Sequence, residues 1–166
     1  MPRTTPFQPR VESLNQTGLW KHWSGYRIAP QYQYSLNAEY YAIRNSVSLL
    51  DTSPLFKYRF AGSDAKKVLE RAMARDIAGC GEGRAQYTCW CDSRGFVLQD
   101  GVVMQVAPGE YLLTAAEPTL RYFRTVARDL ACTDVQIDDI THDYGILALQ
   151  GPHAHQVLSQ LTDAVT

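Results

Sequence analysis

The chain has 166 residues, 45% of them hydrophobic and 20% charged, which is the composition of a folded globular protein rather than a disordered one. Its 16 Lys and Arg residues almost balance 17 Asp and Glu residues, and it has no basic stripe of the kind that binds nucleic acid. No apolar run approaches the roughly 18 residues of a membrane-spanning helix, and the polar opening is unlike a signal peptide, so we expect a soluble, cytoplasmic protein.

Residues 1–34 are expected to form an extended arm that packs on the rest of the chain. Proline fixes the backbone angle φ and removes an N–H donor, so a proline-rich segment disfavours a helix. Four prolines lie in this segment: Pro2, Pro6, Pro9 and Pro30. The segment also carries aromatic side chains of the kind that usually pack onto a folded body: Trp20, Trp23 and Tyr26.

A helix is predicted after the arm, with Asn37 as its N-cap and apolar residues at helical spacing up to Val47. The alternating run 57–61 predicts a strand. Ser63 is the expected N-cap of a second helix, which ends near Gly79.

A three-stranded antiparallel meander is predicted between residues 85 and 116. Its strands are expected at 87–91, 96–106 and 111–115, with turns at 92–95 and 108–109. A third helix from Pro118, strands at 135–140 and 146–149, and a short helix after Gly151-Pro152 complete the pattern. This mixed order predicts an α+β fold, in which the meander packs its apolar face on the helices that begin near Ser63 and Pro118.

The cysteines and histidines do not predict a metal site. The four cysteines form no C-x-x-C pair and are expected to be free thiols: Cys80, Cys89, Cys91 and Cys132. Cys89 and Cys91 are expected on the same face of their strand. His153 and His155 are two residues apart at a helix start, which places them about 200° apart around the helix axis, so a shared metal ion is not expected.

Asp100 is the acidic residue that the strand pattern sets apart. It lies inside the predicted strand 96–106, on the same face as Leu98 and Val102. Carboxylates are depleted from strands, and burying one is costly unless a partner compensates for its charge. We therefore expect that a carboxylate on this apolar face has a specific role. Such a group is either a structural anchor for hydrogen bonds or a functional carboxylate, and the residues alone leave both open. Gly101 beside it leaves room for the close approach of a backbone or a ligand.

Five short motifs between about residues 38 and 161 occur in the order and spacing of one protein family. They are Ala42–Asp51, similar to A-V-R-x-x-V-G-L-F-D; Gly62–Ala65, similar to G-x-D/E-A; Gly83–Thr88, which matches G-R-A-Q-Y-T; Gly95–Asp100, similar to G-G-x-x-D-D; and Leu147–Pro152, which matches L-A-L-Q-G-P. Together they resemble the glycine cleavage T-protein (aminomethyltransferase) family.

This resemblance implies both a fold and a chemistry. Family members place three domains around a channel for tetrahydrofolate, onto which they transfer a one-carbon unit from a nitrogen, oxygen or sulfur carrier. Asp100 matches the second acid of the D-D pair, which makes it the implied catalytic carboxylate and a folate contact. The other implied folate contacts are Leu55, Tyr87, Val102 and Thr114. The implied partners are folate, a small-molecule one-carbon donor, and a carrier protein or C-terminal partner; no metal is implied.

The sequence departs from the family pattern in three segments. Gln99 stands in place of the first acid, Ser53-Pro54-Leu55 in place of S-H-M, and Leu113-Thr114-Ala115-Ala116-Glu117 in place of V-N-A-A-N. The opening Thr5-Pro6-Phe7-x-x-Arg10-Val11-Glu12 is more similar to folate-dependent dimethylsulfoniopropionate demethylases, which also lack the first acid.

The expected organisation is an N-terminal arm over 1–34 and a partial folate-binding domain over 35–166. The resemblance implies that family members are much longer and that their C-terminal half, absent here, supplies further folate contacts. We therefore expect a tetrahydrofolate-dependent aminomethyl or methyl transferase. The alternative is a non-catalytic folate-binding or scaffolding module, or a split subunit that requires a C-terminal partner.

Overall fold

The computed structural model describes residues 2–163, which divide into two compact units. Unit 2 comprises Leu55–Tyr144, and unit 1 combines the described residues up to Pro54 with those from Gly145 onward. The described residues of the segment 1–34 lie in unit 1. Helices and antiparallel strands occur together in both units, which confirms the predicted α+β class.

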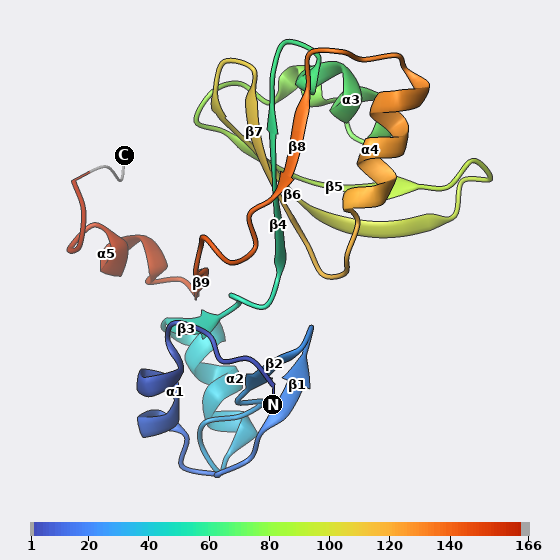
Figure 1. Cartoon of the computed structure of the whole chain (residues 1–166). Helices are drawn as coiled ribbons and strands as arrows, with labels where there is room; N and C mark the ends of the chain where they lie inside the picture. Colours follow the sequence, from blue (N-terminus) through green and yellow to red (C-terminus); the bar gives the residue numbers. More distant parts are fainter. Residues whose placement is uncertain (1, 164–166) are drawn as a thin grey trace. The chain divides into compact units, whose positions relative to one another are not determined.

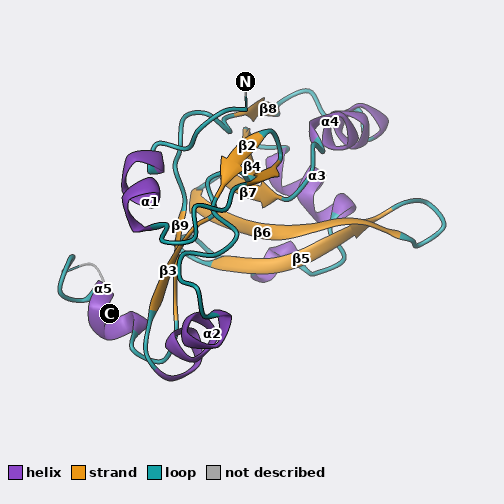
Figure 2. Ribbon diagram, turned by 90° about the horizontal axis from the view of Figure 1, so that it is seen from below, coloured by secondary structure: helices purple, strands orange, loops and turns teal. Residues whose placement is uncertain are grey.

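Unit 2 is built on a five-stranded antiparallel sheet with the strand order β5-β6-β7-β4-β8 (Figure 1). Its strands are β4 (Phe56–Ala61), β5 (Ala85–Cys91), β6 (Val97–Ala107), β7 (Glu110–Ala115) and β8 (Gln136–Asp139). Its helices are α3 (Ala65–Ala72), the short 3-10 helix η1 (Ile77–Gly79) and α4 (Leu120–Asp129). The predicted meander is confirmed as β5, β6 and β7, and the long β5–β6 hairpin is seen along its length in Figure 2.

The two turns of the meander follow from local chemistry. After β5, the Asp92 carboxylate accepts hydrogen bonds from the backbone N–H groups of Arg94 and Phe96 at 2.9 and 3.0 Å. Gly109 has φ +72°, the left-handed value that the third position of a type II turn requires. These turns fix the lengths and pairing of the three strands.

One face of the sheet packs against α3 and α4, as predicted. The strands and helices contribute side chains that are almost completely buried: Tyr58, Phe60, Trp90, Val103, Leu113, Val68, Leu69 and Phe123. The Phe123 ring contacts the rings of Phe60 and Trp90 at centroid distances of 5.2 and 5.3 Å. The indole N–H of Trp90 donates to Thr119 Oγ1 at 3.1 Å, which ties the sheet to the start of α4.

Two predicted helix ends are wrong, one by about seven residues and the other by two. The helix predicted to end near Gly79 stops at Ala72, because Met73 instead forms an antiparallel bridge with Trp90 and a 3-10 turn follows. Helix α4 begins after Thr119 rather than at Pro118; the Thr119 backbone N–H donates to the Tyr58 hydroxyl at 3.0 Å. Tertiary contacts, which sequence patterns do not encode locally, set these ends.

Unit 1 contains two two-stranded antiparallel sheets and three helices among its described residues. Its elements are α1 (Gln8–Leu14), β1 (Lys21–Trp23), β2 (Tyr26–Ile28), α2 (Leu36–Asn45), β3 (Ser48–Asp51), β9 (Leu147–Gln150) and α5 (Ala154–Leu158). Strand β1 pairs with β2, and β3 pairs with β9 across a long separation in sequence. No helix in the described part of the chain is long and apolar enough to cross a membrane.

Two local predictions for unit 1 are corrected by the structure. The prediction of an extended arm without a helix is wrong, because Pro9 lies in the first turn of α1, where its missing N–H would have no partner in any case. Helix α2 is capped by Ser35 rather than Asn37: the Ser35 hydroxyl accepts a hydrogen bond from the Ala38 N–H at 3.3 Å.

Candidate functional site

The implied folate contacts of the meander lie on one face of the unit 2 sheet. Tyr87 of β5 is opposite Val102 of β6, and Val102 is opposite Thr114 of β7. Residues that are opposite one another in antiparallel strands share a face, so these three form a row across the sheet. Asp100 lies two residues from Val102 on β6 and therefore on the same face. Lys57 of β4, opposite Thr114, continues the row, but its side chain is buried and its ammonium group donates to the Thr141 carbonyl at 3.2 Å.

This face is the one that α3 and α4 leave uncovered. The neighbours of the row residues along the strands point to the core and are buried: Thr88, Val103 and Leu113. Tyr87 is 60% exposed, and Asp100 is also exposed. Asp100 thus shares its face with Leu98 and Val102, as predicted, but this face is not buried, because Leu98 is 48% exposed. Alternation along a strand predicts which residues share a face, but not which face the helices cover.

Asp100 and Tyr87 form the polar centre of this face. The Tyr87 hydroxyl donates a hydrogen bond to Asp100 Oδ2 across the β5–β6 pair. Asp100 Oδ1 receives no hydrogen bond from any residue that the structure describes. Tyr87 thus holds the carboxylate in one orientation and leaves one acceptor oxygen available to a ligand.

The same hydrogen bond raises the pKa of the Tyr87 phenol. Donation to Asp100 is the largest cause, because loss of the phenol proton would break the bond, and desolvation and the negative charge of Asp100 act in the same direction. We predict that Asp100→Asn lowers the pKa of Tyr87 toward its ordinary value. Titration of ¹³C-labelled tyrosine by NMR measures this shift, with Asp134→Asn as a control in the same unit. An unchanged Tyr87 titration in Asp100→Asn would show that the two side chains do not interact in solution.

A shallow hollow with a volume of about 580 Å³ lies beside Asp100. Its lining includes Arg75 and Cys89, neither of which is among the predicted site residues. Arg75 lies in the segment that follows α3, beside the edge strand β5. Its guanidinium donates a hydrogen bond to the Tyr87 carbonyl at 3.4 Å. Arg75 belongs to no motif, and it comes near the site because the segment after α3 lies beside β5. Cys89 is opposite Asp100, and its position two residues after Tyr87 predicts that it lies on the same face. A cation and a carboxylate thus line one hollow.

The remaining site positions have different surroundings. The Thr114 hydroxyl accepts a hydrogen bond from the Val102 backbone N–H at 3.3 Å, so this side chain also supports the β6–β7 pairing. Leu55 is half-buried and immediately precedes β4. Gln99 is opposite the buried Trp90 and so faces away from Asp100. The family pattern has an acid at the position of Gln99. Because this position faces away from Asp100, the presence of glutamine there does not alter the charge on the open face.

Several proteins of known sequence are similar to this chain. The family model described as GCVT N-terminal domain matches residues 12–166. The chain is 32% identical over 140 residues to the aminomethyltransferase of Bacillus subtilis (strain 168), and 32% identical over 162 residues to that of Saccharopolyspora erythraea. These matches cover 84% and 97% of this chain but 38% and 43% of the relatives. The chain thus spans about two-fifths of the length of these curated relatives.

A solved structure has the same fold. The aminomethyltransferase T of the glycine cleavage system from Bartonella henselae superimposes with a TM-score of 0.82 and 22% sequence identity. The similarity covers 96% of this chain and 44% of that chain.

Proposed function

Because this chain belongs to the glycine cleavage T-protein family through its GCVT N-terminal domain, we propose that the open sheet face of unit 2 binds tetrahydrofolate for one-carbon transfer. The strand register is the observation that carries this proposal. It brings residues from three separate segments onto the sheet face that α3 and α4 leave uncovered: the exposed Tyr87 and Asp100, and the half-buried Val102 and Thr114. An exposed face with one oriented carboxylate is suited to a flat ligand that carries N–H donors.

Each residue has a distinct part in this proposal. The free Oδ1 of Asp100 accepts a hydrogen bond from a ring or bridge N–H of the reduced folate. Its negative charge also stabilises the positive charge that develops on folate nitrogen as the carbon unit is transferred. Tyr87 holds the carboxylate in place through its bond to Oδ2, and Val102 supplies apolar surface for the ring. Thr114 borders the same surface through its pairing with Val102, and we include Leu55, which immediately precedes β4, as a further proposed contact.

The donor of the carbon unit is a small molecule or a group on a carrier protein. An aminomethyl donor is the first candidate, because the curated relatives are named aminomethyltransferases. A methyl donor of the sulfonium type is the second candidate, favoured by Gln99 in the first acid position and by the segment Thr5–Glu12. Catalysis in either case uses the further folate contacts that the rest of the family polypeptide supplies; without them, unit 2 is a folate-binding module.

Calorimetric titration of the chain with 5-formyltetrahydrofolate, a stable reduced folate, tests the proposal. We expect saturable binding, and no binding of p-aminobenzoylglutamate, which lacks the pteridine ring. Val102→Lys should weaken binding by about tenfold or more, because it removes apolar contact worth roughly 1.5 kcal/mol. The matched control Val106→Lys changes a 43%-exposed valine on the same strand and should bind normally. Absence of reduced-folate binding, or equal loss in both variants, would refute the proposed site.

A further inference from the structure

Two thiols lie on the open sheet face of unit 2 and have no part in the proposed folate contact. Cys89 and Cys91 flank Trp90 on β5, and the Trp90 side chain is completely buried in the core. Alternation along the strand therefore directs both cysteines to the face that α3 and α4 leave uncovered, as the sequence predicts. Both cysteines are free and half-buried. They form a dithiol pair on the accessible side of the sheet.

The other two cysteines of the chain have different surroundings. Cys80 is 2% exposed, and its thiol donates a hydrogen bond to the Arg84 carbonyl at 3.4 Å. Cys132 lies beyond α4 and packs against the core of unit 2. Because a buried structural cysteine is chemically inert, Cys80 is expected to be unreactive in the folded chain. Cys132 serves as the control for a half-buried thiol outside the pair.

The side chains of Cys89 and Cys91 lie close enough to influence one another. Partial burial raises the pKa of the Cys91 thiol, and the charge and hydrogen bonding of Cys89 raise it further. Cys89 also lines the hollow beside Asp100, which is opposite it on β6. Because the thiolate is the reactive form of a cysteine, a raised pKa makes Cys91 less reactive at neutral pH. Cys89 is therefore the thiol that reacts first with a dissolved reagent.

The strand geometry permits a bond between the two sulfur atoms once β5 bends slightly. Residues two apart in a strand have Cα atoms about 6.6 Å apart, and disulfides join residues whose Cα atoms are between about 4.4 and 6.8 Å apart. The Cβ atoms still have to approach each other, which is easiest at the end of an edge strand. β5 is an edge strand that ends at Cys91, and its pairing with β6 shifts register between Trp90 and Cys91. A bond that needs such bending is strained and more easily reduced than a structural disulfide.

We propose that Cys89 and Cys91 are a reversible dithiol–disulfide site, which a small disulfide such as glutathione disulfide oxidises. The Cys89 thiolate attacks one sulfur of glutathione disulfide, forms a mixed disulfide and releases one glutathione thiolate. The Cys91 thiolate then attacks the Cys89 sulfur, which forms the Cys89–Cys91 bond and releases the second glutathione thiolate. The two cysteines lose two electrons and two protons, and glutathione disulfide is reduced to two molecules of glutathione. The site is independent of folate binding, although the bond lies in the wall of the hollow beside Asp100.

Mass spectrometry of the folded chain in glutathione redox buffers tests the proposal. As the ratio of glutathione disulfide to glutathione rises, we expect the peptide that contains Cys89 and Cys91 to lose the mass of two hydrogen atoms. No bond should form to Cys80 or Cys132, and dithiothreitol should restore both thiols of the pair. Absence of the intrachain bond, or a bond to a second copy of the chain in its place, would overturn the proposal.

Single serine substitutions test which thiols form the bond. Cys91→Ser removes the second thiol, so the reaction should stop at the mixed disulfide and leave one glutathione on Cys89. Cys89→Ser should also lose the intrachain bond, whereas the matched control Cys132→Ser should form it normally. The melting temperature of each variant checks that it is folded. An intrachain bond that still forms in either variant of the pair would contradict the assignment.

Phenylarsine oxide gives a second measurement that needs neither oxidation nor a substitution. Its trivalent arsenic binds two neighbouring thiols at once, so it reports whether Cys89 and Cys91 reach a common atom in the reduced, folded chain. We expect the arsenical on the peptide that contains both cysteines, and we expect a small dithiol to remove it. Arsenical binding without disulfide formation in the glutathione buffers would show two close thiols that are not a redox site, which would overturn the proposal.

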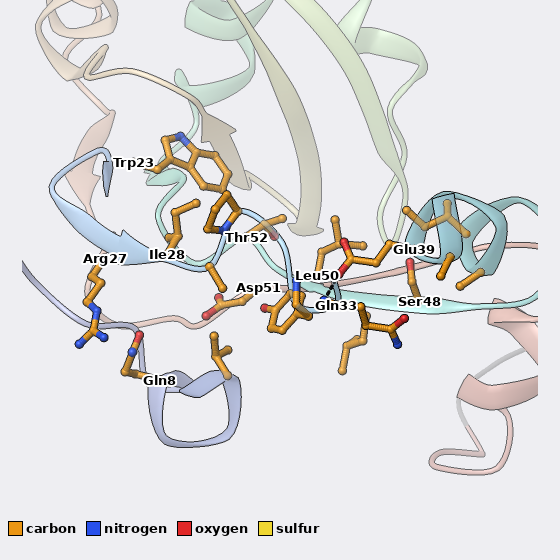
Figure 3. Close-up of a pocket in the computed structure, with 18 residues that line it drawn as sticks. Gln8, Trp23, Arg27, Ile28, Gln33, Glu39, Ser48, Leu50, Asp51 and Thr52 are labelled. Atoms are coloured by element: carbon orange, nitrogen blue, oxygen red, sulfur yellow. Dashed lines mark hydrogen bonds between the residues drawn. The ribbon is translucent and has the colours of Figure 1, made fainter. Parts of the chain in front are cut away.

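The apolar hollow of unit 1 is the alternative place for the phenyl group of this probe. It has a volume of about 490 Å³, and Trp23, Ile28 and Leu50 are among its lining residues (Figure 3). No cysteine is among the described residues that line it, so an arsenical held there has no bond to sulfur and is lost when the chain unfolds. We expect the arsenical to remain bound after the chain is unfolded in acid. Loss of the arsenical on unfolding would place the probe in the hollow of unit 1 and would contradict the proximity of the two thiols.

Discussion

Asp100→Asn is expected to lower tetrahydrofolate-dependent turnover by about 100-fold or more, the range found when one preorganised electrostatic group is lost. The substitution keeps the size and one acceptor oxygen of the side chain but removes its charge. Turnover is measured on this chain together with the remaining family polypeptide. The melting temperature should not change, because Asp100 is exposed and its side-chain bond is to the exposed Tyr87.

Asp100→Asn also distinguishes the two interpretations of Asp100, a structural anchor for hydrogen bonds and a functional carboxylate. If Asp100 is only a structural anchor, Asn should retain turnover per folded molecule. Asp129→Asn, an exposed carboxylate at the end of α4, is the matched control and should be fully active. An active Asp100→Asn protein would rule out the catalytic assignment.

Gly101→Ala is expected to destabilise unit 2 by about 3 kcal/mol, the upper part of the range for overpacking a closely packed site. A Cβ at Gly101 would lie 1.9 Å from the Thr114 carbonyl oxygen and 3.4 Å from the Trp90 ring. Because the first of these contacts is backbone, β6 has to move away from β7. Urea unfolding measures the loss of stability. The close backbone approach expected beside Asp100 is thus present, between neighbouring strands.

Gly81→Ala is the control for this substitution. A Cβ there meets nothing within 4 Å, and Gly81 does not have a left-handed φ. Its effect on stability should stay within about 0.5 kcal/mol. Gly101 also separates Asp100 from Val102, so its substitution should weaken reduced-folate binding even under conditions where the protein remains folded. Equal stability of the two alanine variants would contradict the observed approach of β6 to Thr114.

The strands of unit 2 were predictable because their signals are local. Alternating apolar residues and turn residues such as Gly109 specify β5, β6 and β7 within short windows. Helix ends were less predictable, because the bridge between Met73 and Trp90 that ends α3 joins residues far apart in the chain. The proline content of the segment does not predict α1, because proline disfavours a helix interior but is tolerated in the first turn, where Pro9 lies.

The site was predictable only in part for a related reason. Motif resemblance selected Tyr87, Asp100, Val102 and Thr114, and the strand register places them on one face. The sequence did not show that this face is uncovered, because that depends on where α3 and α4 pack. It also gave no signal for Arg75, whose position depends on the segment after α3 running beside β5. Tertiary packing therefore decides the exposure of Asp100 and the charge around it.

Methyl NMR of the chain titrated with 5-formyltetrahydrofolate tests the central claim most directly. Val102 and Val103 are neighbours on β6 that face opposite sides of the sheet, and Leu113 and Thr114 are the equivalent neighbours on β7. The account predicts that the methyl signals of Val102 and Thr114 shift on binding, while those of the buried Val103 and Leu113 do not. Shifts confined to unit 1, or to the core-facing methyl groups, would contradict folate binding on the open face of the sheet.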